Sequence, residues 1–254
     1  MTVIEALISG IVQGLTEFLP ISSSGHLVLV HRFFGFSEPT MFFDICLHAA
    51  TLCAVIIYFQ KDILDLVMPE NRKWLLYIGV GTIPAVIVAL LFEDGIDKLF
   101  ARPQIVSVML MVTGAVLLAA HISLRFPGKK DREMNLGSSI LVGIGQAFAL
   151  IPGISRSGMT ISSGLMAGIK AETAFKFSFL LSIPVIIMAV GYKSLKTDVS
   201  AILHKDILIY MVGMAAAFVV GLISLHLLWK VIQKKKLYIF GIYCIVAGIL
   251  TLFL

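Results

Sequence analysis

Long apolar stretches, separated by short polar ones, run through almost the whole chain of 254 residues. Six of these stretches are close to the ~20 residues that an α-helix needs to cross the hydrocarbon core of a bilayer. They are residues 42–60, 74–92, 104–124, 174–192, 207–229 and 237–254. This pattern predicts an all-α polytopic membrane protein with six transmembrane helices.

Two further apolar segments, residues 1–31 and 138–169, are interrupted in the middle by Pro, Gly and Ser. The interruptions lie in GIVQGLTEFLPISSSGH at 10–26 and in GIGQAFALIPGISRSG at 143–158. Non-helical backbone at membrane depth is tolerated only where it is buried in protein or lines a water-filled cavity. We therefore expect both segments to form re-entrant helix–turn–helix hairpins.

The two interrupted segments each open one half of the chain, so the order is hairpin, three spans, hairpin, three spans. Because three is odd, the second half must be inserted upside down relative to the first, and this predicts an inverted-topology repeat. We expect a single membrane domain over 1–254, with repeat 1 at about 1–125, a cytoplasmic connector at about 126–137 and repeat 2 at about 138–254. The broken tips of the two hairpins are then expected to meet near the membrane midplane.

Composition and charge agree with this class of protein. Hydrophobic residues make up 59% of the chain and charged residues only 14%, with a mean hydropathy of +1.00, which a soluble domain of this length could not bury. In the predicted topology, twelve Lys and Arg residues lie on one side and six on the other. The positive-inside rule then places both termini on the outer side of the membrane. The three cysteines lie within apolar runs without metal-ligand spacing, so we expect neither a disulfide nor a zinc site.

The first hairpin carries polar side chains that are costly at membrane depth. Glu17 lies four residues after Gln13, so both project from one helix face. An intramembrane carboxylate is functional by default, and the alternative is an interfacial Glu close to water. Ser22, Ser23, Ser24 and Gly25 follow Pro20, and this turn is expected to bind phosphate at the N-terminus of the next helix. A hydroxyl there could serve as nucleophile, with His26 as acid or base, whereas the simpler interpretation is a turn only.

The second hairpin carries Arg156, a permanent positive charge between two apolar half-helices. Its planar fork of donors matches phosphate geometry, and the neighbouring Ser155, Ser157 and Gly158 are expected to bind phosphate with it. If the hairpins meet, Arg156 faces the turn at 22–26 and completes a cationic, donor-rich pocket. The structural alternative is that Arg156 pairs with Glu17 only to hold the two hairpins together.

A few other polar or small residues carry weaker signals. Asp44 and His48 form an i,i+4 pair in the first span and could support the site or form an interhelical hydrogen bond. Gly79, Gly81 and Gly213 suggest close helix packing. Neither GxxxxGK[ST] nor GxGxxG is present, so nucleotide binding has no support, and we expect no nucleic-acid partner.

The motifs EFLPISSSGH at 17–26 and PGISRSG at 152–158 closely resemble those of the bacitracin-resistance family of undecaprenyl-diphosphate phosphatases. The six spans, the two broken hairpins and the segment FSFLLSIP at 177–184 also match the family pattern over essentially the whole chain. The resemblance implies an integral membrane hydrolase that releases the terminal phosphate of undecaprenyl diphosphate. It would thereby recycle the lipid carrier for peptidoglycan synthesis and confer bacitracin resistance.

The resemblance also implies site residues and a cofactor. The acidic motif of the family falls on Gln13 and Glu17, its serine nucleophile candidate on Ser23, its histidine on His26, and its arginine motif on Ser155 and Arg156. A divalent cation, Mg²⁺ or Ca²⁺, is implied, with Glu17 and Gln13 as candidate ligands. Because this chain has Gln at the first position of the motif, only one anionic ligand remains. The family further implies a polyprenyl diphosphate substrate and a possible homodimer.

Two questions stay open at this level. Either Ser23 attacks the terminal phosphorus or His26 activates a water molecule to do so, and the residues alone do not decide between the two. The fold pattern also fits an inverted-repeat lipid flippase or anion transporter, because broken helices at the midplane are common in transporters.

Overall fold

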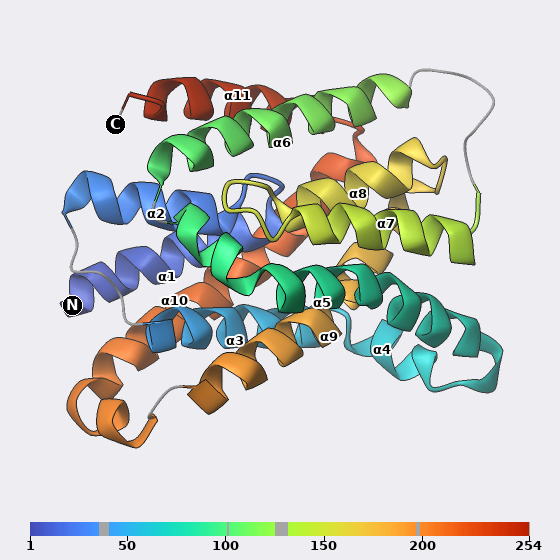
Figure 1. Ribbon diagram of the computed structural model, residues 1–254. Coiled ribbons are helices and arrows are strands. Elements are labelled where there is room, and N and C mark those ends of the chain that lie inside the picture. Colours follow the sequence, from blue (N-terminus) through green and yellow to red (C-terminus); the bar gives the residue numbers. More distant parts are fainter. Residues whose placement is uncertain (36–40, 101, 125–131, 197–198, 254) are drawn as a thin grey trace.

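The computed structural model describes residues 1–35, 41–100, 102–124, 132–196 and 199–253 (Figure 1). Within these residues the chain forms eleven α-helices, one 3₁₀ turn and no strand, which confirms the all-α prediction. The first half contains α1 (Val3–Phe18), α2 (Ser23–Phe34), α3 (Met41–Tyr58), α4 (Gln60–Leu66), the 3₁₀ turn η1 (Pro69–Asn71), α5 (Arg72–Phe100) and α6 (Pro103–Ser123). The second half contains α7 (Leu136–Phe148), α8 (Arg156–Met166), α9 (Ala171–Lys196), α10 (Val199–Gln233) and α11 (Tyr238–Thr251).

The number of helices that can cross a membrane differs from the six predicted. Among the described residues, four segments are long and apolar enough: Pro69–Ile96, Pro103–Ser123, Ala171–Leu195 and Ile207–Gln233. The predicted span at 42–60 is a bent pair instead, with 74° between Phe42–Tyr58 and Gln60–Leu66. The predicted span at 237–254 is α11, whose 14 residues rise only about 21 Å against a hydrocarbon core of about 30 Å. Length and composition therefore support four spans, or five if the bent pair counts as one.

Both interrupted segments form helix–turn–helix hairpins, α1–α2 and α7–α8, with matching local chemistry. In the first, the side chain of Ser22 caps α2 by accepting a hydrogen bond from the Gly25 amide at 3.3 Å. In the second, Ser155 caps α8 in the same way through the Gly158 amide at 3.1 Å. Ser at the N-cap satisfies one of the amides that a helix start leaves without a partner. The Ser/Gly spacing therefore restarts the helix after each break.

The tips of the two hairpins lie against each other. A Cβ atom at Gly25 would come within 3.2 Å of the Gly153 Cα, and one at Gly158 within 3.4 Å of the Pro20 Cβ. Gly153 has a φ of +93°, a conformation that glycine adopts without strain. The expected meeting of the two broken segments is thus present in the structure.

Each hairpin also packs its first helix on a long helix of the other half, α1 on α10 and α7 on α5. Glycines allow this close approach, because a Cβ at Gly10 would lie 2.2 Å from the Gly213 carbonyl oxygen and one at Gly143 would lie 2.3 Å from that of Gly81. Gly81 and Gly213 therefore do pack closely, whereas Gly79 is exposed with open space around it. In both pairs, a hairpin helix of one half packs on a long helix of the other half, as a two-fold repeat would produce. The inverted topology itself stays a prediction.

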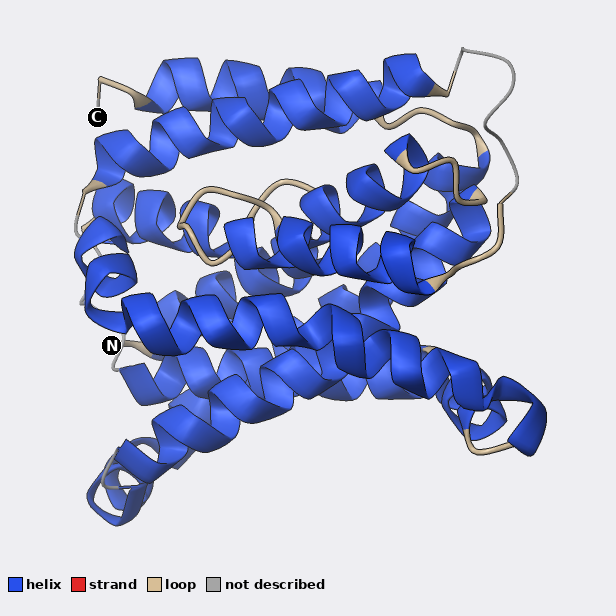
Figure 2. Ribbon diagram, turned by 45° about the vertical axis from the view of Figure 1, so that its right-hand side comes forward, coloured by secondary structure: helices blue, strands red, loops and turns tan. Residues whose placement is uncertain are grey.

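The connector between the halves is only partly within the described residues. Residues 126–131 of the predicted connector lie outside them. In the described part, the Arg132 amide donates to the Gly168 carbonyl, and Asn135 caps α7. The two chain termini lie at the same end of the helix bundle (Figures 1 and 2), and the side of the membrane that this end faces stays a prediction.

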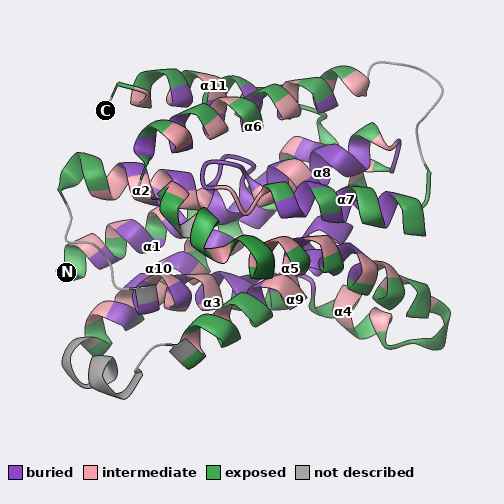
Figure 3. Cartoon of the chain, in the orientation of Figure 1, coloured by how far each residue is buried: buried purple, intermediate pink, exposed green. Residues whose placement is uncertain are grey.

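Exposed residues lie on the outward faces of the bundle (Figure 3). Many of them are large and apolar, as expected where lipid is the solvent. Leu76, Ile83 and Leu90 on α5 and Ile242 and Leu250 on α11 are examples. Inside, Phe18 contacts Phe179 edge to face with ring centroids 5.7 Å apart, and Phe59 and Phe175 pack on the same ring. Since Phe18 is fully buried, this aromatic cluster fixes the end of α1, where Glu17 lies.

The α5–α7 contact predicts the effect of a single added side chain. We expect Gly143→Val to lower the free energy of unfolding by about 1–3 kcal/mol, because the new side chain collides with the Gly81 backbone. Thermal unfolding of detergent-solubilised protein measures the change. Gly79→Val is the matched control on an exposed position of α5, and equal melting temperatures for the two variants would contradict the close packing.

Candidate active site

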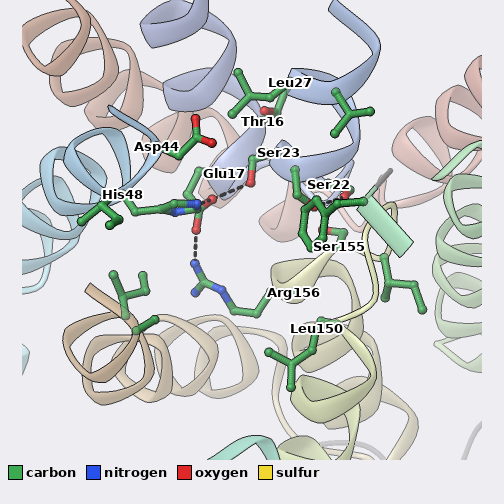
Figure 4. A pocket seen from close by; sticks show the side chains of 18 of the residues that line it. Thr16, Glu17, Ser22, Ser23, Leu27, Asp44, His48, Leu150, Ser155 and Arg156 are labelled. Carbon is green, nitrogen blue, oxygen red and sulfur yellow. Dashed lines mark hydrogen bonds and ion pairs between the residues drawn. The ribbon is translucent and has the colours of Figure 1, made fainter. Parts of the chain in front are cut away.

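A cavity of about 330 Å³ lies where the two hairpin tips meet α3 and α9 (Figure 4). One part of its wall is polar and includes Glu17, Ser23, His48 and Arg156. Another part of the wall is apolar and consists of Leu27, Val28, Ile45, Phe100, Ala149, Leu150, Ile154, Val185, Ile186, Ala189 and Val190. The cavity can thus hold a ligand that has one strongly polar end and one hydrocarbon end.

The carboxylate of Glu17 connects the polar groups of the site. Arg156 Nη2 donates to Glu17 Oε1 at 2.5 Å, and Ser23 Oγ donates to Oε2 at 2.6 Å. Gln13 Nε2 donates to the same Oε2 at 3.1 Å. The Glu17 side chain is only 6% exposed, so this charge is stabilised by protein donors rather than by bulk water.

One terminal nitrogen of the Arg156 guanidinium, Nη2, donates to Glu17, and the other, Nη1, can donate to a ligand. It is the first residue of α8, its side chain is 15% exposed, and it lines the cavity. Nη1 is buried and has no hydrogen-bond partner among the described residues. A buried donor without an acceptor is costly, which makes Nη1 suited to an anionic ligand in the cavity.

Serine hydroxyls and helix N-termini also lie at the polar wall of the cavity. Ser22, Ser23, Ser24 and Ser155 all line the cavity. Ser22 has a φ of +70°, an unusual conformation for a residue with a side chain, and such strain is found mainly at functional turns. The first turns of α2 and α8 present N–H groups and a positive dipole end beside Arg156.

Three of the predicted phosphate-binding residues do not line the cavity. The amides of Gly25 and Gly158 are used by the Ser22 and Ser155 caps. Ser157 is fully buried, with its Oγ 3.3 Å from Ser155 Oγ. These three residues shape the tips rather than face the space that a ligand would occupy, and direct phosphate contact by them stays a prediction.

His26 is not among the residues that line the cavity, although it was expected in the pocket. Its Nδ1 donates to the Ser22 carbonyl oxygen at 2.8 Å, and its Nε2 accepts from the Tyr243 hydroxyl at 2.7 Å. The His26 and Tyr243 rings are stacked, with centroids 5.6 Å apart. Both ring nitrogens are therefore engaged toward the hairpin turn and α11. A role for His26 in the reaction stays a prediction.

The imidazole beside Glu17 is that of His48, on α3. His48 Nδ1 lies 3.1 Å from Gln13 Nε2 and 3.6 Å from Glu17 Oε2, and the ring lines the cavity. Asp44, one turn earlier, and Lys193 on α9 also line the cavity. In the sequence, the i,i+4 spacing of Asp44 and His48 on an apolar span indicated that the two side chains share one helix face. It did not predict which helix that face contacts.

The candidate cation ligands do not form a cation site as they are arranged. Gln13 turns its nitrogen, which cannot ligate a metal, toward Glu17, and Arg156 already places a positive charge on the carboxylate. No group of three His, Cys, Asp or Glu side chains is positioned to hold a metal within the described part of the chain. The predicted Mg²⁺ or Ca²⁺ is thus not matched by a protein ligand set built on Glu17 and Gln13.

Fold and site together define a class: a helical membrane protein with a cavity that is lined by an arginine and serines and in which a serine hydroxyl donates to a buried carboxylate. Residues 6–250 match the family model described as bacitracin resistance protein BacA. The chain belongs to this family.

Curated relatives match along nearly the whole chain. The undecaprenyl-diphosphatase of Syntrophotalea carbinolica is 38% identical over 98% of this chain and 97% of its own length. Undecaprenyl-diphosphatase 1 of Shouchella clausii is 39% identical over 99% of this chain and 96% of its own length. The undecaprenyl-diphosphatase of Korarchaeum cryptofilum is 38% identical over 99% of both chains.

The Glu17–Arg156 pair predicts a strong coupling in stability. We expect Arg156→Met to destabilise the protein by roughly 3–5 kcal/mol, because it leaves the buried carboxylate without its counter-charge. Adding Glu17→Gln should recover part of this loss, since no uncompensated charge then remains. Thermal unfolding of the two single variants and the double variant measures the coupling, and additive effects would contradict a direct pair.

Proposed function

We propose that this protein is an undecaprenyl-diphosphatase, a membrane hydrolase that converts undecaprenyl diphosphate to undecaprenyl phosphate and inorganic phosphate. The observation that carries the proposal is the Ser23 hydroxyl aligned on Glu17 Oε2, beside an arginine with a free donor, in a cavity with an apolar wall. The curated relatives are undecaprenyl-diphosphatases by name, which supports the same substrate here. In the cell this reaction returns the lipid carrier to peptidoglycan synthesis and accounts for bacitracin resistance.

The lipid substrate binds with its diphosphate at the polar wall and the first part of its prenyl chain along the apolar wall. Arg156 Nη1 and the N–H groups at the start of α2 and α8 bind the phosphate oxygens. Because these donors are fixed in a site of low dielectric, they stabilise negative charge on the phosphoryl group as it transfers. The positive groups also offset the electrostatic cost of bringing a diphosphate beside the Glu17 carboxylate.

Ser23 Oγ attacks the terminal phosphorus, and Glu17 takes the proton of the hydroxyl. The bond from that phosphorus to the bridging oxygen breaks, and undecaprenyl phosphate leaves as an anion that needs no proton. Water then attacks the phosphoserine, Glu17 returns the proton to Ser23 Oγ, and both protons of the water stay on inorganic phosphate, which leaves as H₂PO₄⁻. The alternative route, in which His26 activates a water molecule, has less support, because the two His26 nitrogens bond the Ser22 carbonyl and the Tyr243 hydroxyl.

A transporter or flippase, the other function expected for this kind of fold, would need to bind the lipid but not to activate a hydroxyl. The alignment of Ser23 on Glu17 favours hydrolysis. The proposed location is the bacterial cytoplasmic (inner) membrane, with both termini on the outer side. A homodimer is also proposed, from the family resemblance.

The serine route predicts the outcome of a trapping experiment. We expect Ser23→Ala to lower the rate of phosphate release from undecaprenyl diphosphate roughly 10³-fold or more, because Ser23 has the one hydroxyl that donates to Glu17 within the described part of the chain. Acid quenching of the wild type with terminally ³²P-labelled substrate should yield a labelled protein, and Ser23→Ala should not. Ser224→Ala, a buried serine of α10 bonded to its own helix, is the matched control. Near-normal turnover by Ser23→Ala would overturn the mechanism.

We propose that the divalent cation, Mg²⁺ or Ca²⁺, is bound mainly by the diphosphate oxygens of the substrate. Mg²⁺ commonly binds through substrate phosphates in this way. Removing the metal with EDTA should stop turnover, whereas calorimetric titration of the substrate-free protein with Mn²⁺ should show no stoichiometric site. A tight Mn²⁺ site that Glu17→Gln abolishes would contradict this arrangement.

A further inference from the structure

Gln13 and His48 form a polar unit next to Glu17 that the reaction described above does not use. Gln13 is fully buried in α1, one turn before Glu17, and its Nε2 contacts both Glu17 Oε2 and His48 Nδ1 at 3.1 Å. The His48 side chain is 38% exposed and lines the cavity. Figure 4 shows the His48 ring on one side of Glu17, with Ser23 and Arg156 on the others.

The carboxylate determines how the Gln13 amide is turned. An ionised carboxylate only accepts hydrogen bonds, so the Gln13 nitrogen, and not its oxygen, must face Glu17 Oε2. The other N–H of the same nitrogen then meets His48 Nδ1. Gln13 Oε1 has no hydrogen-bond partner among the described residues, so a single orientation of the amide serves both neighbours.

This orientation in turn determines the state of the His48 ring. Because an amide nitrogen can only donate, His48 Nδ1 must accept, and the ring proton is on Nε2. Nε2 has no hydrogen bond with another described residue, and it lies on the edge of the ring opposite Gln13. The ring therefore offers a neutral N–H donor from the wall of the cavity.

A neutral donor suits this position better than an imidazolium. A charged His48 would pair directly with Glu17, 3.6 Å away, and would weaken the carboxylate as a base for Ser23. With Nδ1 bonded to Gln13, Glu17 keeps its negative charge for the Ser23 proton. At the same time, Nε2–H can stabilise negative charge on a phosphate oxygen.

We propose that His48 is a further catalytic residue, which donates a hydrogen bond from Nε2 to a non-bridging oxygen of the transferring phosphoryl group. Gln13 is the positioning residue that holds the ring in this tautomer. No proton is transferred by His48 at any step. The role of His48 as a donor rests on the proposed function, whereas its tautomer does not.

Kinetics of phosphate release test the donor. We expect His48→Ala to lower kcat about 10²–10³-fold, the usual effect of removing one donor to developing oxyanion charge. His48→Gln, whose amide keeps an N–H donor, should recover most of this loss. His226→Gln, at an exposed position of α10, is the matched control. Wild-type kcat in His48→Ala would overturn the proposal, and so would a His48→Gln variant as slow as His48→Ala, because that result requires a proton-transferring ring.

A second measurement needs no activity. In protein labelled with ¹⁵N-histidine, the difference spectrum between wild type and His48→Gln gives the two ring nitrogens of His48. We expect a protonated Nε2 and an unprotonated Nδ1 in the wild type, and loss of this fixed tautomer in Gln13→Met. A proton on Nδ1 in the wild type would overturn the proposal. If the wild type released no phosphate from undecaprenyl diphosphate, the proposed function would fail while the tautomer result stood.

Discussion

The ion pair between Glu17 and Arg156 is the interaction on which the site depends. Its partners lie 139 residues apart, at the end of α1 and at the start of α8, so the pair forms only if the two hairpin tips meet. In a buried environment neither charge is tolerable alone, and each therefore constrains the position of the other. Both partners also have further contacts or unused donors: Glu17 accepts from Ser23, and Arg156 Nη1 has no hydrogen-bond partner among the residues that the structure describes.

The two hairpins share their architecture and differ in their chemistry. Both restart a helix with a serine cap, Ser22 in one and Ser155 in the other, and both direct an N-terminus at the cavity. The first then adds the Glu17 carboxylate and the Ser23 hydroxyl, and the second adds the Arg156 guanidinium. The proposed reaction therefore takes its base, Glu17, from the first hairpin and its positively charged donor, Arg156, from the second.

Much of this arrangement could be predicted from the sequence, and the physical reasons are specific. The length of the apolar stretches predicted the long helices. The pattern Ser–x–x–Gly after Pro20 and after Pro152-Gly153 predicted where α2 and α8 begin. Both features depend on the local sequence and need no knowledge of how the helices pack. Glu17, Ser23 and Arg156 stood out because polar groups are costly in apolar segments. The predicted span at 237–254 corresponds to α11, whose 14 helical residues are fewer than a full crossing needs, so this span stays a prediction.

What the sequence could not predict are contacts that depend on how helices pack. His26 was expected in the pocket from its distance along the chain, but Tyr243 on α11 holds it on the other side. His48 was visible only as a polar residue on an apolar span, and its contact with Gln13 requires α3 to lie beside α1. For both histidines, the sequence indicated a polar side chain in an apolar segment but could not predict which residue it contacts.

The most direct test is an experimental structure of the protein with a methylene-bridged polyprenyl diphosphonate, which cannot be hydrolysed. We predict that the terminal phosphonate lies in the cavity between Ser23 Oγ and the Arg156 guanidinium, with the prenyl chain along Leu27, Leu150 and Ile186. A head group bound elsewhere, with Ser23 and Arg156 both free of it, would contradict the meeting of the two hairpins as the catalytic site.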